Sequence, residues 1–414
     1  MAEAQIAYEP SDKLWLWWLS DPTIPRLVGE LRMDRPFKGV ALTYGDDWLA
    51  AGLALSEDLP LYPGEMRPSE KETAAGAIDD ARPDRWGERV IRFLDKPQRL
   101  SVLDYLYYAG HERFGALGVS LSSEVYRPRR LGPLPQLADV TTIEELARRI
   151  LAGEPVDEAD RRLIAPGVTF GGARPKGLIE IDGHQWVIKF SEPGEDFDMP
   201  LVEHATMTLC AQAGIQVAET RAIRLPRGNA VAVRRFDRSG GRRLHAMSAN
   251  VALKAMKAEL GYPELASLLR RRGVVEGGLA RAQMRELFRR MVFNILIDNT
   301  DDHEKNHVLL NTPGEDLSLS PAFDVLPSGQ ALGYQQMRVG ADGHDSTIDN
   351  AMTEARLFGL KDQEAKAEVA RVARVVSGWK EHFRQSGVAS RDIELLAEQI
   401  DRPHLASQRA AHGG

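Results

Sequence analysis

Residues 291–311, with the sequence MVFNILIDNTDDHEKNHVLLN, constrain the fold more than any other stretch of the chain. The first of them place apolar side chains at the spacing of one helical face, which predicts a helix that runs into a hydrophobic core. The polar run 299–302 follows, and its Asn, Thr and Asp residues favour caps and turns over helix interiors. Residues 308–310 are β-prone and predict a short strand. We therefore expect a polar loop that is held at both ends, the kind of loop that often carries catalytic groups.

Two chemistries can be assigned to this loop, and the first is phosphoryl transfer. Asp301 and Asn306 stand five residues apart, as in the catalytic loop of protein kinases, where the Asp positions a hydroxyl and the Asn binds metal. Downstream, Asp324 follows another predicted strand, where the kinase Asp that holds magnesium belongs. Carboxylate and amide oxygens are hard ligands that suit Mg²⁺ bound to nucleotide phosphates.

The second chemistry is zinc-dependent hydrolysis, because His303-Glu304-x-x-His307 matches the pattern of zinc proteases. That pattern needs both histidines on one face of an uninterrupted helix, with the glutamate as general base. The turn residues before the motif and the β-prone run after it leave little room for such a helix. The sequence therefore favours the first chemistry over zinc binding, and also over a polar turn without a function.

Composition excludes several classes of protein. The chain has 414 residues, enough for two or three domains. It is 43% hydrophobic and 27% charged with a net charge of −7, so it has no broad basic surface for nucleic acid. Its single cysteine, Cys210, rules out an intrachain disulfide. No stretch is apolar enough to span a bilayer and no signal peptide is evident, so a cytoplasmic protein without a membrane partner is expected.

A glycine-rich stretch precedes a predicted hairpin. Residues 167–177 read GVTFGGARPKG, and close glycines let backbone N–H groups approach phosphate oxygens. Arg174 and Lys176 add positive charge there. Asp182-Gly183 is a strong hairpin signal between the predicted strands 178–181 and 185–190.

Lys189 lies within the apolar run of the second strand. It could reach the edge of a sheet and remain solvated. In kinases, however, a lysine on the strand after the glycine-rich loop binds phosphates and is held by a helix glutamate. Glu203 begins such a helix, predicted over 201–213, so an ion pair with Lys189 is the favoured interpretation. The strands that follow end in residues 234–238 (RRFDR), which suits a connection between two lobes whose backbone would meet adenine.

The predicted architecture is an α+β fold. Short antiparallel strands at 13–19, 27–31, 37–44 and 53–61 mix with helices at 84–94 and 101–109. Three tryptophans near residue 15 could form a platform for bases, but core packing is the favoured interpretation. The segment 247–414 is mostly helical, with predicted helices that include 281–296 and 361–383.

The chain resembles the HipA-family serine/threonine kinases, the toxins of bacterial type II toxin–antitoxin modules. The resemblance rests on residues 81–87 (ARPDRWG) and 110–118, on GGARPK, VRRFDR, NTDDHEKNH and SPAFD, and covers nearly the whole chain. It implies a protein-kinase-like fold of two lobes. Residues 1–135 would form the N-terminal HipA subdomain, 136–246 a nucleotide-binding region like a kinase N-lobe, and 247–414 a helical C-lobe with the catalytic loop.

The resemblance also implies residue roles. Asp301 would be the catalytic base, with His303 and Lys305 in the catalytic loop, and Asn306 and Asp324 would bind Mg²⁺. The implied ATP-binding residues are Gly171, Gly172, Ala173, Arg174, Lys176, Lys189, Glu203, Arg234, Arg235, Phe236, Asp237, His303, Asn306 and Asp324. Autophosphorylation would fall on Thr169, where familiar members carry serine, and would disable ATP binding by moving the loop.

The implied function is transfer of the ATP γ-phosphate to a protein hydroxyl. Family members act on translation-related targets such as an aminoacyl-tRNA synthetase, and a HipB-like antitoxin would be the partner, with nucleic acid bound only through that antitoxin. Two alternatives stay open: a zinc hydrolase that uses His303 and His307, and a catalytically silent module that binds an antitoxin.

Overall fold

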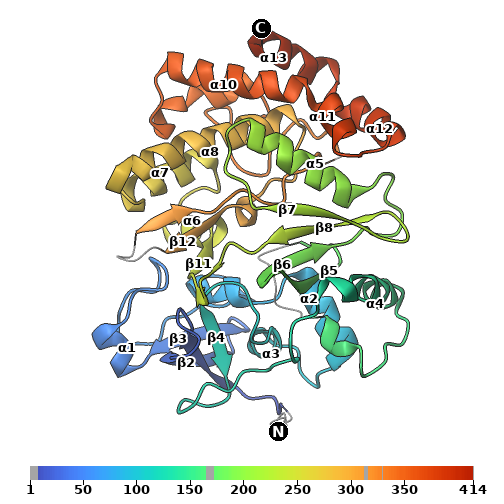
Figure 1. Cartoon of the computed structure of the whole chain (residues 1–414). Coiled ribbons are helices and arrows are strands. Elements are labelled where there is room, and N and C mark those ends of the chain that lie inside the picture. The colour runs from blue at the N-terminus through green and yellow to red at the C-terminus, as the bar shows by residue number, and fades with distance from the viewer. Residues whose placement is uncertain (1–7, 165–171, 312–315, 329, 414) are drawn as a thin grey trace. The chain divides into compact units, whose positions relative to one another are not determined.

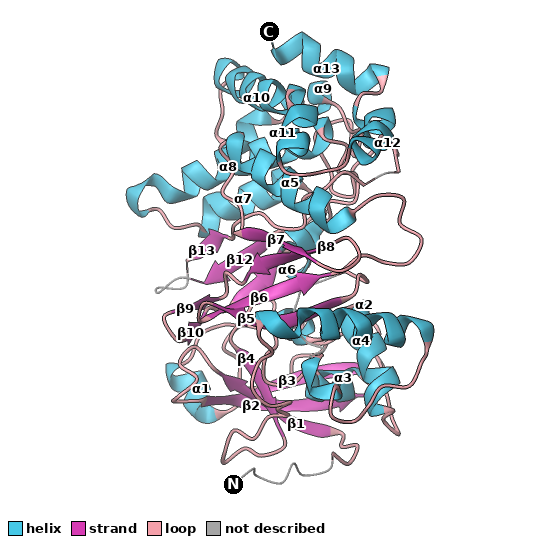
Figure 2. Cartoon of the chain, turned by 45° about the vertical axis from the view of Figure 1, so that its right-hand side comes forward, coloured by secondary structure: helices cyan, strands magenta, loops and turns pink. Residues whose placement is uncertain are grey.

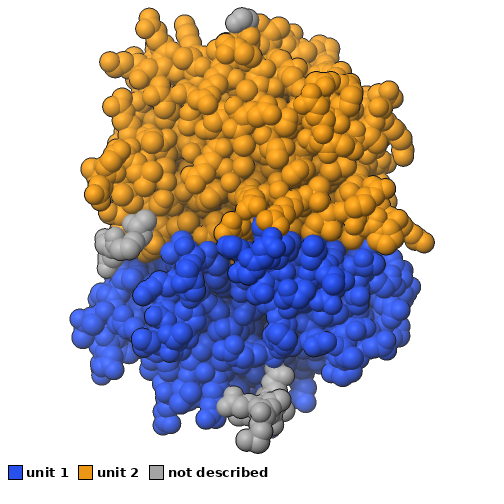
Figure 3. All heavy atoms as spheres, viewed as in Figure 1, with its two compact units in different colours: residues 1–188, 237–247 blue, residues 189–236, 248–414 orange. Residues whose placement is uncertain are grey.

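The structure, a computed structural model, describes residues 8–164, 172–311, 316–328 and 330–413. Its contacts divide the chain into two compact units (Figure 3). Unit 1 contains residues 1–188 and 237–247, and unit 2 contains residues 189–236 and 248–414. These bounds differ from the three predicted segments, so the division into three domains stays a prediction.

Unit 1 contains an antiparallel sheet with the strand order β3-β2-β1-β4, drawn as arrows in Figure 2. Its strands are β1 (Lys13–Trp18), β2 (Arg26–Asp34), β3 (Gly39–Tyr44) and β4 (Leu117–Ser120). Leu14 and Leu16 point into the core by simple alternation, and a register shift after Leu16 buries Trp17 as well. The core-packing interpretation is therefore confirmed for Trp17.

One predicted strand of unit 1 is wrong. Residues 53–61 form bends and turns instead of a strand. The Ser56 hydroxyl donates to the carboxylate of Asp58 at 2.6 Å and accepts from the backbone N–H of Ala77 at 3.1 Å. Such side-chain hydrogen bonds compete with the ladder of a sheet.

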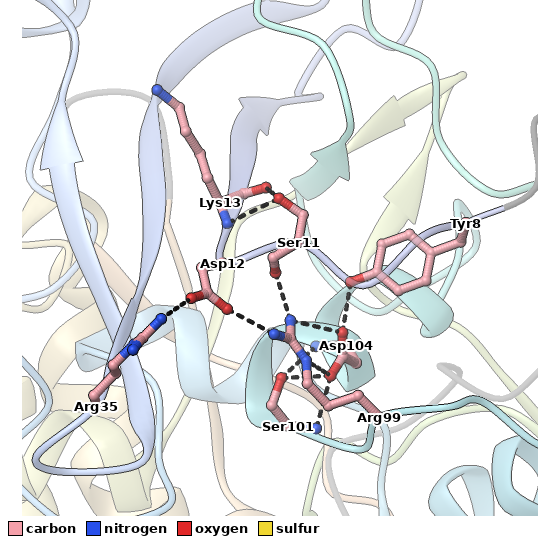
Figure 4. A network of polar contacts seen from close by, with 8 residues as sticks. All are labelled: Tyr8, Ser11, Asp12, Lys13, Arg35, Arg99, Ser101 and Asp104. Atoms are coloured by element: carbon pink, nitrogen blue, oxygen red, sulfur yellow. Dashed lines mark hydrogen bonds and ion pairs between the residues drawn. The ribbon is translucent and has the colours of Figure 1, made fainter.

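The helices of unit 1 are α1 (Asp46–Ala51), α2 (Arg85–Val90), α3 (Val102–Tyr108) and α4 (Val140–Ala152). The predicted helix 84–94 is α2 followed by a π-helical turn, Ile91–Asp95. A polar network joins the start of the described chain to α3 (Figure 4). Arg99 contacts Asp104 at 2.8 Å and Asp12 at 2.6 Å, and the Tyr8 hydroxyl donates to Asp104 at 2.6 Å.

The predicted hairpin after the glycine-rich stretch is present. Strands β5 (Lys176–Ile181) and β6 (His184–Lys189) are hydrogen-bonded neighbours. Asp182 and Gly183 both have positive φ, 52° and 72°, as the two-residue turn of such a hairpin requires. The short strands β9 (Arg238–Ser239), β10 (Arg242–Arg243) and β11 (Ala246–Ser248) follow later in the chain.

In unit 2, helix α5 (Met199–Gln212) packs on the antiparallel hairpin of β7 (Thr220–Arg224) and β8 (Asn229–Arg234). A second hairpin is formed by β12 (Val308–Asn311) and β13 (Leu317–Leu319). The remaining helices, labelled in Figure 1 except for α9, which Figure 2 labels, are α6 (Ala249–Ala255), α7 (Tyr262–Arg272), α8 (Leu279–Leu296), α9 (Ile348–Thr353), α10 (Asp362–Ser377), α11 (Trp379–Gln385), α12 (Ser390–Ile400) and α13 (Pro403–Gly413).

Helix α8 is the core helix of unit 2. It contacts α7 and α10, and its second half is almost entirely buried. From Met291 to Leu296 every side chain except Asn294 is apolar, as expected of a helix that is covered on all sides. Among the described residues, no helix has the length and apolar character needed to cross a membrane.

Candidate functional site

The loop between α8 and β12 begins with a sharp turn. Asp298 adopts the left-handed conformation (φ 63°), which turns the chain out of the helix. Its carboxylate contacts Arg402 at 2.7 Å, and its carbonyl accepts from the backbone N–H of Ser328 at 3.0 Å. The hydroxyls of Thr300 and Ser328 lie 2.6 Å apart. The start of the loop is therefore fixed by two other segments of unit 2.

A buried polar network holds the middle of the loop. The Asp302 carboxylate lies 2.8 Å from His307 Nε2 and accepts from the hydroxyl of Tyr262, which in turn accepts from Asn294 at 3.3 Å. Burial acts to raise the pKa of Asp302, but His307 and the hydrogen bonds from His307 and Tyr262 outweigh it, so the pKa lies below its ordinary value. Asp302 thus stays ionised and anchors the loop.

Sequence reasoning missed Asp302 and Tyr262. Tyr262 lies 40 residues before Asp302, on α7, so no local pattern connects the two. The signal that was present is the Asp301-Asp302 pair itself. In an irregular loop, adjacent side chains point in different directions, and one acid can anchor the loop while the other faces solvent.

Asp301 is the exposed member of that pair. Partial burial raises the pKa of its carboxyl; His303 opposes this effect, and the charges of Asp324 and Asp302 add to it. An accessible carboxylate with a raised pKa is suited to accept a proton from a hydroxyl.

Lys189 joins Glu203 and Asp324. Its Nζ lies 2.6 Å from Glu203 Oε1 and 2.6 Å from Asp324 Oδ1. Burial acts to lower the pKa of Lys189, but the two carboxylates outweigh it and raise the pKa, so the lysine is charged. The ion pair between Lys189 and Glu203 that the sequence predicts is present, and Asp324 is a third member.

The segment that carries Asp324 is fixed by backbone contacts. Ala322 exchanges hydrogen bonds of 2.8 Å with the residues before β7, Gln216 and Ala218. On the other side, Arg290 of α8 donates to the carbonyl of Ser320 at 2.7 Å. Asp324 itself has a positive φ of 59°. Its carboxylate is therefore directed by a well-anchored turn rather than by a free loop.

The zinc motif does not have the geometry that zinc proteases need. Residues Glu304–Asn306 form a single 3₁₀ turn, and His303 and His307 are in extended conformations on either side of it. His307 Nε2 is taken by Asp302. No group of three or more His, Cys, Asp or Glu side chains that could hold a metal occurs among the described residues. The zinc-hydrolase alternative is therefore not supported. Of the other predicted site residues in this turn, Asn306 is 7% exposed and Lys305 is half-buried.

The predicted glycine-loop residues belong to unit 1. Thr169 and Gly171 lie outside the described residues. Gly172 and Ala173 are exposed, and Arg174 is half-buried. Lys176 is 2% exposed, and its Nζ contacts Asp84 Oδ2 at 2.7 Å. The structure therefore gives Lys176 a buried carboxylate partner that the sequence did not reveal.

The predicted connection between lobes contains residues of both units. Arg234 contacts Glu219 at 3.0 Å, and the rings of Phe236 and Phe323 lie 5.3 Å apart. Arg235 is 4% exposed. Asp237, in unit 1, is fully buried and accepts from the backbone N–H of Gly115 at 2.7 Å. Their contacts with a nucleotide stay predictions.

Two protein-family models match the chain. A model described as "HipA-like C-terminal domain" matches residues 168–379, and one described as "HipA N-terminal domain" matches residues 23–120. The first covers the loop with Asp301, the Lys189 strand and Asp324. The second covers α2 and three strands of the four-stranded sheet, β2, β3 and β4.

Individual relatives are more distant. A putative kinase, Y4dM, of Sinorhizobium fredii is 29% identical over 210 residues, which are 45% of this chain and 47% of the relative, so the match spans about half of that protein. The HipA chain in a complex of HipA, HipB and operator DNA from Shewanella oneidensis has a TM-score of 0.65 at 18% identity and covers 96% of this chain and 97% of that one. The Helicobacter pylori proinflammatory kinase CtkA has a TM-score of 0.46 at 13% identity and covers 60% of this chain and 94% of that one.

Proposed function

Because the chain belongs to the HipA family, we propose that it is a serine/threonine protein kinase that transfers the γ-phosphoryl group of ATP to a protein hydroxyl. The observation that carries the proposal is the grouping in unit 2 of a charged lysine with two carboxylates, Glu203 and Asp324. In addition, the charge of Asp324 contributes to the raised pKa of the accessible Asp301 carboxyl. A lysine held by a helix glutamate and two separate acids are the parts that phosphoryl transfer to a hydroxyl requires.

Each of these residues has a distinct role in the proposed reaction. Asp301 orients the attacking hydroxyl and accepts its proton as the new oxygen–phosphorus bond forms and the bond to the β-phosphate oxygen breaks. Lys189 balances phosphate charge, and Glu203 keeps its ammonium group in place. The network of Asp302, His307 and Tyr262 holds the loop so that Asp301 does not move away from the hydroxyl.

The donor set fits a magnesium ion. Asn306 and Asp324 would hold it, since a carboxylate and an amide oxygen are ligands that Mg²⁺ accepts alongside phosphates and water. The side chain of Asp324 is 33% exposed and therefore accessible to a ligand. When bound, the ion would neutralise charge on the phosphates.

The remaining parts of the proposal concern nucleotide and partners. We expect Gly172, Ala173 and Arg174 to approach the phosphates, and residues 234–237 to lie by the adenine. Autophosphorylation at Thr169 would switch the enzyme off. The solved relative from Shewanella is in a complex with HipB and operator DNA, which supports a HipB-like antitoxin as partner, with DNA reached through it. An aminoacyl-tRNA synthetase is the proposed class of substrate.

The proposal is tested with the purified chain, γ-labelled ATP and Mg²⁺, followed by intact mass and peptide mapping. We expect phosphate transfer by the wild type and a loss of about 10²- to 10⁴-fold in Asp301→Asn, because the general base is removed. Nucleotide affinity should stay within about 3-fold of the wild type, since Asp301 acts on the hydroxyl. Asp362→Asn, at a carboxylate that is 74% exposed on α10, is the matched control and should behave as the wild type.

The outcome also separates the kinase from a silent antitoxin-binding module. A wild-type chain that binds no nucleotide in a titration with MgATP would overturn the kinase proposal and favour the silent module. Binding without transfer to any residue of the chain would leave a kinase that acts only on another protein, and Asp301→Asn would then be compared on that substrate.

A further inference from the structure

The far end of the glycine-rich segment is attached to helix α2. Lys176 Nζ lies 2.7 Å from Asp84 Oδ2, and the two side chains are only 2% and 3% exposed. The other carboxylate oxygen of Asp84 accepts from the backbone N–H of Gly87 at 2.7 Å and thereby caps the N-terminus of α2. The lysine is therefore tied to a carboxylate that is itself held in place by the helix.

Trp86 makes a second attachment within the same helical turn. Its indole Nε1–H donates to the carbonyl of Lys176 at 2.8 Å, and its backbone N–H donates to the carbonyl of Gly172 at 3.4 Å. The indole is 1% exposed, so these bonds are shielded from water. Both ends of the segment 172–176 are thus bonded to α2.

Gly172 allows this arrangement. Its φ is 99°, a conformation that side chains rarely adopt, and a Cβ atom there would lie 2.8 Å from Lys176 Nζ. The glycine therefore lets the backbone pass close to the ammonium group that Asp84 holds. A buried lysine paired in this way cannot turn toward a phosphate without breaking its ion pair with the buried Asp84 carboxylate, which is unfavourable.

We propose that Asp84 and Trp86 are positioning residues for the ATP-binding loop, and that Lys176 fastens the loop to α2 instead of binding phosphate. The inference rests on the proposed kinase function. Asp84 and Trp86 lie within the matched N-terminal domain, 23–120, whereas Gly172 and Lys176 lie within the matched C-terminal domain, 168–379. The N-terminal domain thereby sets the position of a nucleotide-binding element that belongs to the C-terminal domain.

Asp84→Asn distinguishes the two candidate roles of Lys176, fastening the loop and binding phosphate, by the direction in which it changes the affinity for MgATP. The amide oxygen of asparagine can still cap α2, so mainly the negative charge is lost. If Lys176 fastens the loop, the variant should bind MgATP about 10-fold more weakly or worse, because the ammonium group loses its anchor. If Lys176 binds phosphate, removal of the competing carboxylate should leave the affinity unchanged or tighter, and the inference would be overturned.

Trp86→Phe tests the second attachment and does not disturb any charge. Phenylalanine keeps an aromatic ring but cannot donate to the Lys176 carbonyl. We expect the KM for ATP to rise about 3- to 10-fold, the effect of one hydrogen bond, with little change in kcat at saturating ATP. Trp48→Phe is the matched control, because Trp48 is equally buried in unit 1 and donates its Nε1–H to the carbonyl of Leu53 at 3.0 Å. The control should keep the wild-type KM.

Hydrogen exchange of the nucleotide-free chain provides a readout that does not depend on activity. Peptides that span residues 172–176 should exchange faster in Trp86→Phe than in the wild type and in Trp48→Phe. If the wild type binds no nucleotide, the kinase proposal fails, while the exchange result still decides whether α2 holds the loop. Unchanged exchange together with an unchanged KM in Trp86→Phe would refute the inference, whatever the outcome for Asp84→Asn.

Discussion

Asp298 makes the stability of the turn before the Asp301 loop depend on pH. Its side chain is almost completely buried, and this burial raises the pKa to about 6, although Arg402 partly opposes the shift. In the unfolded chain the carboxyl should titrate near its ordinary pKa of about 3.9. Between these two values the folded state binds more protons than the unfolded state. The contribution of Asp298 to stability is therefore fully present below about pH 4 and is lost as the pH rises through about 6.

Asp298→Asn should remove this pH dependence. Asparagine tolerates the left-handed conformation that Asp298 adopts, so the turn is retained. We expect the free energy of unfolding in urea, taken as variant minus wild type, to increase between about pH 4 and 6 and to level off above that range. A difference in the free energy of unfolding that is constant with pH would contradict the raised pKa of Asp298. Asp362→Asn, at an exposed carboxylate of α10, is the control for the loss of one carboxylate.

At the scale of single residues, the sequence predicts those whose role depends on order along the chain. Asp301 and Asn306 are found from their fixed spacing in the sequence. Lys189 precedes a helix that begins near Glu203, so the ion pair between Lys189 and Glu203 follows from local pattern. Partners that are distant in sequence could not be predicted in this way. Asp84 lies 92 residues from Lys176, and without the fold the lysine is simply another cation in a glycine-rich stretch.

At the scale of elements, α7 supports the loop that carries Asp301 through one hydroxyl. Tyr262 begins α7, is fully buried and donates to Asp302. Tyr262→Phe keeps the ring and removes this bond, which should lower the free energy of unfolding by about 2 kcal/mol because the acceptor is charged. Loss of the bond should also slow phosphate transfer at saturating ATP, since the loop that carries Asp301 becomes less ordered.

Tyr44→Phe is the matched control for this prediction. The Tyr44 hydroxyl is buried in unit 1 and donates to the carbonyl of Leu59 at 2.8 Å. Its removal should cost about 1 kcal/mol of stability and leave the rate of transfer unchanged. Urea unfolding and initial-rate measurements on both variants check the comparison. Equal losses of rate in the two variants would mean that Tyr262 acts only through general stability.

Element boundaries are predicted well where a local change of residue type marks them, and poorly where packing in the folded chain decides them. The helix that ends before Asp298 and the strand at Val308–Asn311 were both expected from the change of residue type. The segment 361–383 was predicted as one helix, but Gly378 divides it into α10 and α11. Helical periodicity continues across that glycine, and only packing in the folded chain reveals the break.

At the scale of the whole molecule, the predicted α+β fold and the HipA family are both confirmed. The unit boundaries could not be read from the sequence, because residues 237–247 return to unit 1 after residues 189–236 have entered unit 2. The chain crosses between the units three times, after residues 188, 236 and 247, and no linker composition marks these crossings. Six of the seven tryptophans lie in unit 1, and only Trp379 lies in unit 2. Tryptophan fluorescence therefore reports mainly on unit 1, whereas most helical residues belong to unit 2.

This distribution allows a test of whether each unit loses its structure separately. Arg409 of α13 is buried and donates to the carbonyls of Ile400 at 2.6 Å and Leu296 at 3.2 Å, and it contacts Asp401 at 2.7 Å. It thus fastens the end of the chain to the end of α8. Arg409→Met should destabilise unit 2 by about 2–3 kcal/mol, because buried carbonyls lose their donors.

The two spectroscopic signals should then separate. Since each unit has its own core, we expect the far-UV circular dichroism transition of Arg409→Met to move to lower urea, while the fluorescence transition moves less. Arg384→Met is the control, because the Arg384–Glu381 pair is exposed on α11 and should contribute less than about 1 kcal/mol. If both signals of Arg409→Met shifted together by the same amount, the two units would unfold as one cooperative structure. The end of the chain would then stabilise the sheet of unit 1 as strongly as the helices that it contacts.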